Sequence, residues 1–398
     1  MIYIPWYFVH TINEPVLFGQ IYFGITCVSL FWGLYVGTLV DKYSRKKLFM
    51  SENFFGACVF GGIGVYTIMS GEVFMPLVGL AFACTFFIYN LHYPTLYAFA
   101  QELIEKENYS KISTWLEVQG QLTTVGGGAV AALLMAGISS GETSLFGFSF
   151  YSPIHIEKWS LGQVFLLDGT TYLLSCILIS FIKYQPTVNR FKEKGNVFQQ
   201  LKIGVQFLKN NPLIFVFGNA AYFIFVTILV TNYQLMPNFI SNVLNGDGLS
   251  YALADMVYAL GAVGAGLSTR ILFKRTSTVM GNILLTLLGV LVFISFAFTQ
   301  ELSWLYVSLF FLAVANSGSR IMRVVYILKR VPNQVIGRSQ SVFQVINVIQ
   351  RLLFIGLFTL PFFVDKIRWS FGIFAVCAFI AALLLMFYYR KLIEVPEI

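Results

Sequence analysis

The stretch Gly33–Lys47, GLYVGTLVDKYSRKK, decides how the rest of the chain is interpreted. Eight apolar or small residues lead directly into Asp41, and four cations follow within six positions. Lys and Arg collect on the cytoplasmic side of membrane proteins. The stretch therefore predicts a spanning helix that ends at the cytoplasm, and the aspartate among the cations needs a separate explanation.

The composition indicates a membrane protein with many spans. Of the 398 residues, 57% are hydrophobic and only 11% are charged, and the mean hydropathy is +0.75. Soluble domains carry about 25% charged residues. The net charge of +8 does not predict nucleic-acid binding, because the basic residues form short clusters between apolar runs. The five cysteines have neither metal-ligand nor redox spacing, so we expect no metal and no cofactor.

Apolar segments long enough to cross a bilayer, which takes about 20 residues, recur along the whole chain. The predicted spans are 16–40, 48–69, 74–103, 112–138, 161–182, 212–237, 248–272, 277–299, 302–327 and 336–364, with an eleventh at 367–392. If the 41–47 loop is cytoplasmic, alternation places all Lys and Arg on that side except Lys158, Lys366, Arg368 and the intramembrane Arg351. This bias predicts a cytoplasmic C-terminus.

Two halves of similar length flank a polar linker. We predict an N-terminal helix bundle over 1–185, a cytoplasmic linker over 186–211 and a C-terminal bundle over 212–398. In the linker, Val197, Leu201, Val205 and Leu208 fall on one helical face, which is typical of an amphipathic helix at the membrane surface.

The two halves repeat each other in their charged positions. Gly37, Asp41, Arg45 and Lys46 have the spacing of Gly266, Arg270, Lys274 and Arg275, and both sets end a span at the cytoplasm. A second repeat aligns the stripe Glu117, Gln121 and Thr124 with Gln340, Gln344, Asn347 and Arg351. A polar stripe on a membrane helix should face the protein interior, so the repeat predicts a shared, water-accessible cavity.

The beginning of the chain breaks the repeat. Pro5-Trp6-Tyr7 resembles Pro237-Asn238-Phe239, but only four residues precede Pro5, whereas a whole span precedes Pro237. We therefore expect the first half to lack about 20 residues of its first span, through truncation or a mis-assigned start. The full plan would be twelve spans in two six-helix bundles, and such repeats are typical of transporters. The first residues show no cleavable leader.

The loop resembles the signature of the major facilitator superfamily, Gly-x-Leu-x-Asp-[Arg/Lys]-x-Gly-[Arg/Lys]-[Arg/Lys]. The matching residues are Gly37, Leu39, Asp41, Lys42, Arg45 and Lys46. Ser44 departs from the usual glycine, which is favoured where φ is positive. HYPTLYAFAQELI (His92–Ile104), VFLLDGTTYLLS (Val164–Ser175) and GVQFLKNNPLI (Gly204–Ile214) are similar to the macrolide-efflux and enterobactin-exporter branch. The fourth-span arginine and the fifth-span Gly-Pro of many proton-coupled exporters are absent.

The resemblance assigns roles to individual residues. It implies that the loop around Asp41 locks the two halves in the outward-facing state; the alternative is a solvated aspartate that balances the cations. It also implies that spans one, four, seven and ten line the cavity. The residues of those spans that could contact substrate are Asn90, His92, Asn219 and Tyr222. His92 is also a candidate pH-sensitive group, the alternative being a packing histidine.

Three charged residues inside or near spans each have two possible roles. Arg351 lies about 22 Å of helix from the cytoplasmic start of its span and would pair with Glu117, Asp168 or an anionic substrate. The alternative is a structural ion pair. Glu117 could carry protons or lie near the headgroups, and Asp168 could make a helix–helix hydrogen bond, with the neighbouring threonines helping, or bind a proton.

The resulting prediction is a secondary transporter, not an enzyme, that exports amphipathic small molecules by proton-coupled alternating access. The alternatives are a siderophore or metabolite transporter and a truncated, non-transporting membrane protein. No nucleophile–base pair, metal cluster or Walker-type loop is found in the sequence. The expected partners are a small-molecule substrate, protons and the lipid bilayer, without nucleic acid. The expected state is a monomer in the bacterial cytoplasmic (inner) membrane.

Overall fold

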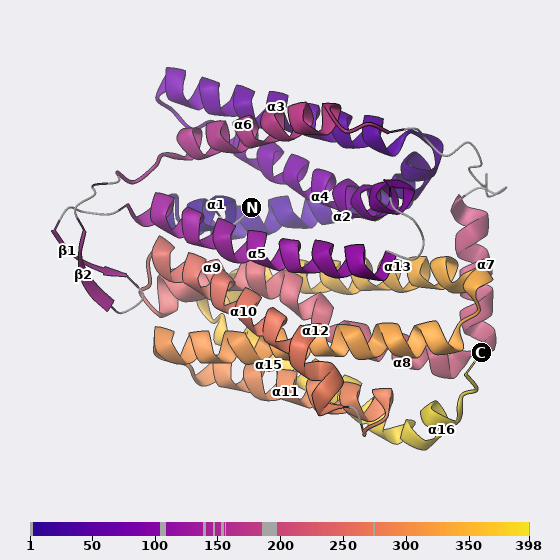
Figure 1. The fold of residues 1–398 in the computed structure, drawn as a ribbon. Coiled ribbons are helices and arrows are strands. Elements are labelled where there is room, and N and C mark those ends of the chain that lie inside the picture. Colours follow the sequence, from indigo (N-terminus) through magenta and orange to yellow (C-terminus); the bar gives the residue numbers. More distant parts are fainter. Residues whose placement is uncertain are drawn as a thin grey trace. The chain divides into compact units, whose positions relative to one another are not determined.

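The computed structural model describes residues 3–103, 109–137, 141–145, 148–152, 155, 157–184, 197–273 and 275–397. In this part of the chain, ten helices are long and apolar enough to cross a membrane (Figure 1). This confirms the predicted all-α membrane protein with many spans. The predicted span 112–138 forms helix α5 (Tyr109–Ala136), whose first half carries the polar residues of the predicted stripe.

The elements of the first half begin with short helical turns before the first long helix. They are α1 (Tyr3–Trp6), the π-helix η1 (Tyr7–Thr11), α2 (Pro15–Lys42), α3 (Arg45–Ser70), α4 (Met75–Leu103), α5 and α6 (Leu161–Ser180). Between α5 and α6, the strands β1 (Gly141–Leu145) and β2 (Phe148–Ser152) form an antiparallel hairpin that pairs Gly141 with Ser152. The sequence analysis did not predict this hairpin.

The second half begins with the linker helix α7 (Val197–Asn210) and continues into a span interrupted by π-helical turns. Its elements are α8 (Pro212–Val230), η3 (Thr231–Leu235), α9 (Met236–Asn238), η4 (Phe239–Val243), α10 (Gly248–Leu272), α11 (Thr278–Phe298), α12 (Leu302–Arg330), α13 (Asn333–Phe358), α14 (Pro361–Asp365), α15 (Arg368–Phe387) and α16 (Tyr389–Glu394). The π turns lie on both sides of Pro237, which has no N–H to donate to the regular helical ladder. The span therefore runs on to Val243.

The chain divides into two compact units. One contains Met1–Ile4, Gly24–Leu122 and Leu133–Val197, and the other contains Pro5–Phe23, Thr123–Ala132 and Phe198–Ile398. Two segments of the first half, the start of α2 and the middle of α5, thus belong to the second unit. The predicted boundaries at 185 and 212 remain a sequence-based prediction.

In the first unit, α3 and α6 lie side by side and pack through glycines (Figure 1). A Cβ at Gly64 would lie 2.6 Å from the backbone nitrogen of Leu166, and a Cβ at Gly56 would lie 2.8 Å from the Tyr172 ring. Small residues let membrane helices approach until their backbones touch. This close packing fixes the face of α3 that carries the polar groups described below.

In the second unit, α8 packs against α12, α13 and α15. The segments contributed by the first half join it through glycines, because Gly19 of α2 lies against Thr359 and Gly128 of α5 lies against Met256 of α10. The linker helix α7 is also held, since Gly204 lies against the backbone of Arg338 at the start of α13. Of the predicted apolar face, Leu208 is buried and Leu201 half-buried, whereas Val205 is exposed, so α7 packs through part of that face.

Candidate functional site

The cations of the signature loop bind partners within the first unit. Arg45, the first residue of α3, forms an ion pair with Glu102 near the end of α4, at 3.0 Å between Nη1 and Oε1. The other Glu102 oxygen accepts a hydrogen bond from the Tyr184 hydroxyl. Arg45 and Glu102 are each only 13% exposed, and pairs shielded from water are weakened less by solvent and salt than exposed ones. The ends of α3 and α4 and the segment after α6 are therefore tied together.

Lys46 strengthens the same corner. Its Nζ donates to the carbonyl oxygens of Ser180 and Ile182, each at 2.7 Å. The last carbonyls of a helix lack intrahelical donors and carry partial negative charge. Lys46 supplies the end of α6 with both a hydrogen-bond donor and a positive charge. Lys42, by contrast, is exposed, with its Nζ 5.3 Å from the centroid of the Tyr43 ring.

Ser44 fits the loop although the family signature has glycine there. Its φ of −61° and ψ of 125° place it in the extended region, as the residue before the first turn of α3. A negative φ is open to every residue type. The turn therefore does not need glycine, and the expectation that position 44 would have a positive φ is wrong.

Several predicted site residues cannot be placed. The side chains of Glu117, Gln121, Asp41, Arg270 and Lys274, and the surroundings of Gly37, lie outside the described residues. Gly266 is exposed, and a Cβ there would meet no atom within 4 Å. The roles of the Asp41 lock and of its echo in the second half thus remain predictions.

A carboxylate–imidazole pair, of which only the carboxylate is buried, lies between α3 and α4. The Nδ1 of His92 is 3.0 Å from Oε1 of Glu52. The Glu52 side chain is 1% exposed and that of His92 is 37% exposed. Phe49 lies against the imidazole with its ring centroid 4.8 Å away. The sequence analysis selected His92 and missed Glu52, although a glutamate seven residues into an apolar span is itself a signal of function.

The surroundings of this pair are polar on the α6 side. Tyr172 of α6 lies close enough to Glu52, Asp168 and Cys84 for their charges to act on its hydroxyl group. The threonine hydroxyls beside Asp168 donate to carbonyls of their own helix, Thr171 to Asp168 itself at 2.7 Å, so they do not bridge helices as the sequence suggested. Asn90 likewise donates to Phe86 of its own helix at 2.9 Å.

In the second unit, Tyr222 of α8 joins three helices. The guanidinium carbon of Arg323 on α12 lies 3.5 Å from the centroid of its ring, and its hydroxyl donates to Gln340 on α13 at 3.3 Å. Arg323 also donates to the carbonyl of Ala221 at 3.0 Å and is 5% exposed. The predicted cytoplasmic placement of Arg323 did not anticipate that its side chain is buried among helices.

The residues of the predicted polar stripe on α13 differ in how far they are buried. Asn347 and Arg351 are buried, whereas Gln344 is exposed. Arg351 lies inside the span Val335–Phe358, as predicted, and within electrostatic range of Tyr22 on α2. Asn219 of α8 donates to Phe215 of its own helix at 2.8 Å. Among the described residues, no group of three His, Cys, Asp or Glu side chains could hold a metal ion.

Comparison with known proteins identifies the family. A family profile described as Major Facilitator Superfamily matches residues 1–355. The chain therefore belongs to the major facilitator superfamily. No curated protein matches its sequence.

Solved structures of transporters share the fold. A variant of the nucleoside transporter NupG aligns with a TM-score of 0.70 and 13% identity, over 96% of this chain and 93% of that one. A bacterial homologue of the human lysosomal transporter Spinster, inward-facing and unoccupied, gives 0.64 and 13%, over 96% and 91%. A D-xylose–proton symporter gives 0.65 and 12%, over 94% and 87%. Together with the family, these neighbours indicate a transporter rather than an enzyme; the efflux branch stays a prediction.

Proposed function

We propose that this protein is a proton-coupled secondary transporter that exports amphipathic small molecules by alternating access. The observation that carries the coupling is the pair formed by Glu52 and His92 inside the first unit. Family membership supports transport itself. Such a pair can link proton binding to a change in helix packing.

The pair can hold one proton or two. A buried carboxylate is costly unless it is paired or protonated, and an ordinary histidine changes charge between pH 5 and 8. Oε2 of Glu52 is buried without a hydrogen-bond partner among the described residues, whereas the imidazole is partly exposed. A proton can therefore arrive through His92 while Glu52 stays shielded.

A second proton changes the contact between α3 and α4. With one proton, imidazole and carboxylate attract each other as a charged or strongly hydrogen-bonded pair. With two, the carboxylate is neutral and the attraction weakens. Arg45, Glu102 and Lys46 hold the cytoplasmic ends of α3, α4 and α6 together, so we expect the loosened contact to move the helices about that fixed corner.

A second candidate, transport of an anionic or strongly polar metabolite or siderophore, is favoured by the buried arginines of the second unit. Arg323 and Arg351 are 5% and 6% exposed. Intramembrane arginines commonly mark substrate or ion pathways. The solved nucleoside transporter and xylose–proton symporter with this fold extend the range of substrates that deserve testing.

The test is transport by the purified full chain in proteoliposomes with an imposed pH gradient. Macrolides, cationic dyes, siderophores, nucleosides and xylose are offered separately. The proposal expects uphill movement of an amphipathic compound that collapses when a protonophore removes the gradient. If a substrate is transported at a rate that does not depend on the pH gradient, proton coupling is wrong. If flux driven by the pH gradient is confined to polar metabolites, the second candidate replaces the export proposal.

A further inference from the structure

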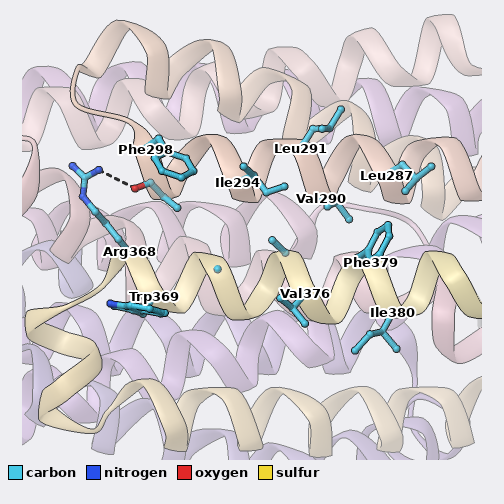
Figure 2. A pocket seen from close by; sticks show the side chains of 13 residues that line it. Leu287, Val290, Leu291, Ile294, Phe298, Arg368, Trp369, Val376, Phe379 and Ile380 are labelled. Atoms are coloured by element: carbon cyan, nitrogen blue, oxygen red, sulfur yellow. Dashed lines mark hydrogen bonds between the residues drawn. The ribbon is translucent and has the colours of Figure 1, made fainter.

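An apolar groove lies between α11 and α15 and takes no part in the function proposed above. Its volume is about 1040 Å³. Figure 2 shows its lining, to which α11 contributes Leu291, Ile294 and Phe298 and α15 contributes Val376, Phe379 and Ile380. Of all the residues lining it, only Arg368 is charged.

The length of the groove matches one leaflet of a bilayer. On α11 its lining runs from Leu287 to Phe298, which is about 16 Å of helix. Half of a hydrocarbon core of about 30 Å is about 15 Å. The groove therefore extends from one membrane surface to near the midplane, the depth reached by a single acyl chain.

Arg368 stands at the surface end of the groove and is fixed there. It is the first residue of α15, and its Nη1 donates to the carbonyl oxygen of Ala297 at 2.9 Å, near the end of α11 (Figure 2). A guanidinium has five N–H donors in a planar fork that matches phosphate. The neighbouring Trp369 is 63% exposed, as is typical of tryptophan at headgroup level.

The charges at this end run against the general bias of the chain. By the predicted orientation, the non-cytoplasmic side carries only three Lys and Arg residues, and Lys366 and Arg368 are two of them. Positive charge is normally kept off this side. The acid of the same turn, Asp365, leaves the pair of cations in excess. An anion at the mouth of the groove explains why they are present.

We propose that the groove binds one phospholipid, with an acyl chain between α11 and α15 and the phosphate on Arg368. Lys366 adds positive charge near the headgroup. Gly372 supports this assignment, because a Cβ there would meet no atom within 4 Å; the missing side chain leaves the groove open. A second copy of the chain or a transported substrate would need neither a phosphate-binding fork nor a depth of one leaflet.

The experiment counts lipids on the purified full chain in dodecyl maltoside by native mass spectrometry during titration with dioleoyl phosphatidylglycerol. Wild type should retain one tightly bound lipid. Arg368→Gln should weaken binding about fivefold, since a cation near an anionic surface is worth about that much. Gly372→Leu should abolish the tight site by filling the groove. Gly62→Leu, at an equally open glycine on α3, should bind as wild type does.

Further arms separate the occupants. Diacylglycerol and inorganic phosphate should each fail to compete, because each supplies half of the ligand. Thermal unfolding of each variant without lipid confirms that it is folded, and we expect Gly372→Leu to match wild type. The proposal would be overturned if folded Gly372→Leu bound lipid as wild type does, or if Gly62→Leu lost binding equally. It would also be overturned if a transported compound displaced the lipid, or if a lipid-free dimer buried this face.

Discussion

Glu52 and His92 show how much a single contact can change the meaning of a residue. His92 alone in a span is more often a packing residue than a pH-sensing group. At 3.0 Å from a glutamate whose side chain is 1% exposed, it becomes half of the pair that we propose couples proton binding to transport. Arg323 shows the same effect, because its guanidinium carbon lies 3.5 Å from the centroid of the Tyr222 ring. This buried connection between α8 and α12 is not visible from the place of Arg323 among the cations of the sequence.

His92→Gln tests the coupling role. Glutamine can still donate a hydrogen bond to Glu52 but cannot take up a proton, so we expect flux driven by the pH gradient to fall at least roughly tenfold, with substrate exchange at equal pH retained. Both are measured in proteoliposomes. Thr85→Ala, which removes a hydroxyl bonded only to its own helix, is the control on α4. Full gradient-driven flux in His92→Gln would exclude the pair as the coupling site.

Arg45 and Glu102 should be energetically coupled. Because both side chains are only 13% exposed, we expect an interaction free energy of about 1 kcal/mol, the upper end for pairs in contact with water. Unfolding of Arg45→Ala, Glu102→Ala and the double variant in detergent measures it as a double-mutant cycle. Purely additive effects of the two substitutions would show that this corner of the first unit is not held by the pair.

At the scale of elements, glycines decide which helices pack. The spacing of small residues on α3 is visible in the sequence, but the partner helix is not. The structure pairs α3 with α6 and places the added Cβ of Gly64 2.6 Å from a backbone nitrogen that cannot move away. The linker helix is a second case, because its amphipathic pattern predicts a helix at the membrane surface but does not reveal that Gly204 seats it against α13.

Gly64→Leu should therefore destabilise the first unit by about 2–3 kcal/mol, the usual cost of overpacking a close contact. Gly62→Leu, two residues away with no atom within 4 Å of its added Cβ, is the matched control and should unfold like wild type. Thermal unfolding in detergent compares them. Equal stability of the two variants would contradict the α3–α6 packing.

At the scale of the whole molecule, the sequence and the comparisons agree on a transporter of the major facilitator superfamily. The gate predicted around Asp41 belongs to this scale, because a lock would control how the whole molecule changes between its outward-facing and inward-facing states. Arg45 and Lys46 are committed to Glu102 and to the end of α6, so their cationic charge is already bound within the first unit.

Asp41→Asn should leave expression and thermal stability within about 0.5 kcal/mol of wild type, as for most substitutions away from the core, and should largely abolish transport. The asparagine keeps the shape of the side chain and removes its charge. Uptake or export by proteoliposomes at matched protein density is the measurement, with Lys47→Gln at an exposed position in the first turn of α3 as the control. Wild-type flux in Asp41→Asn would make this residue a solvated loop aspartate.

The sequence by itself determined the membrane spans and the family, because both depend on local properties: the length of apolar runs and the residues of one contiguous loop. The position of Arg351 inside a span followed in the same way. Only the tertiary structure decided which side chains meet. Glu52 with His92, Arg323 with Tyr222, and the groove between α11 and α15 each bring together residues of different helices. Such contacts depend on packing that no single segment encodes.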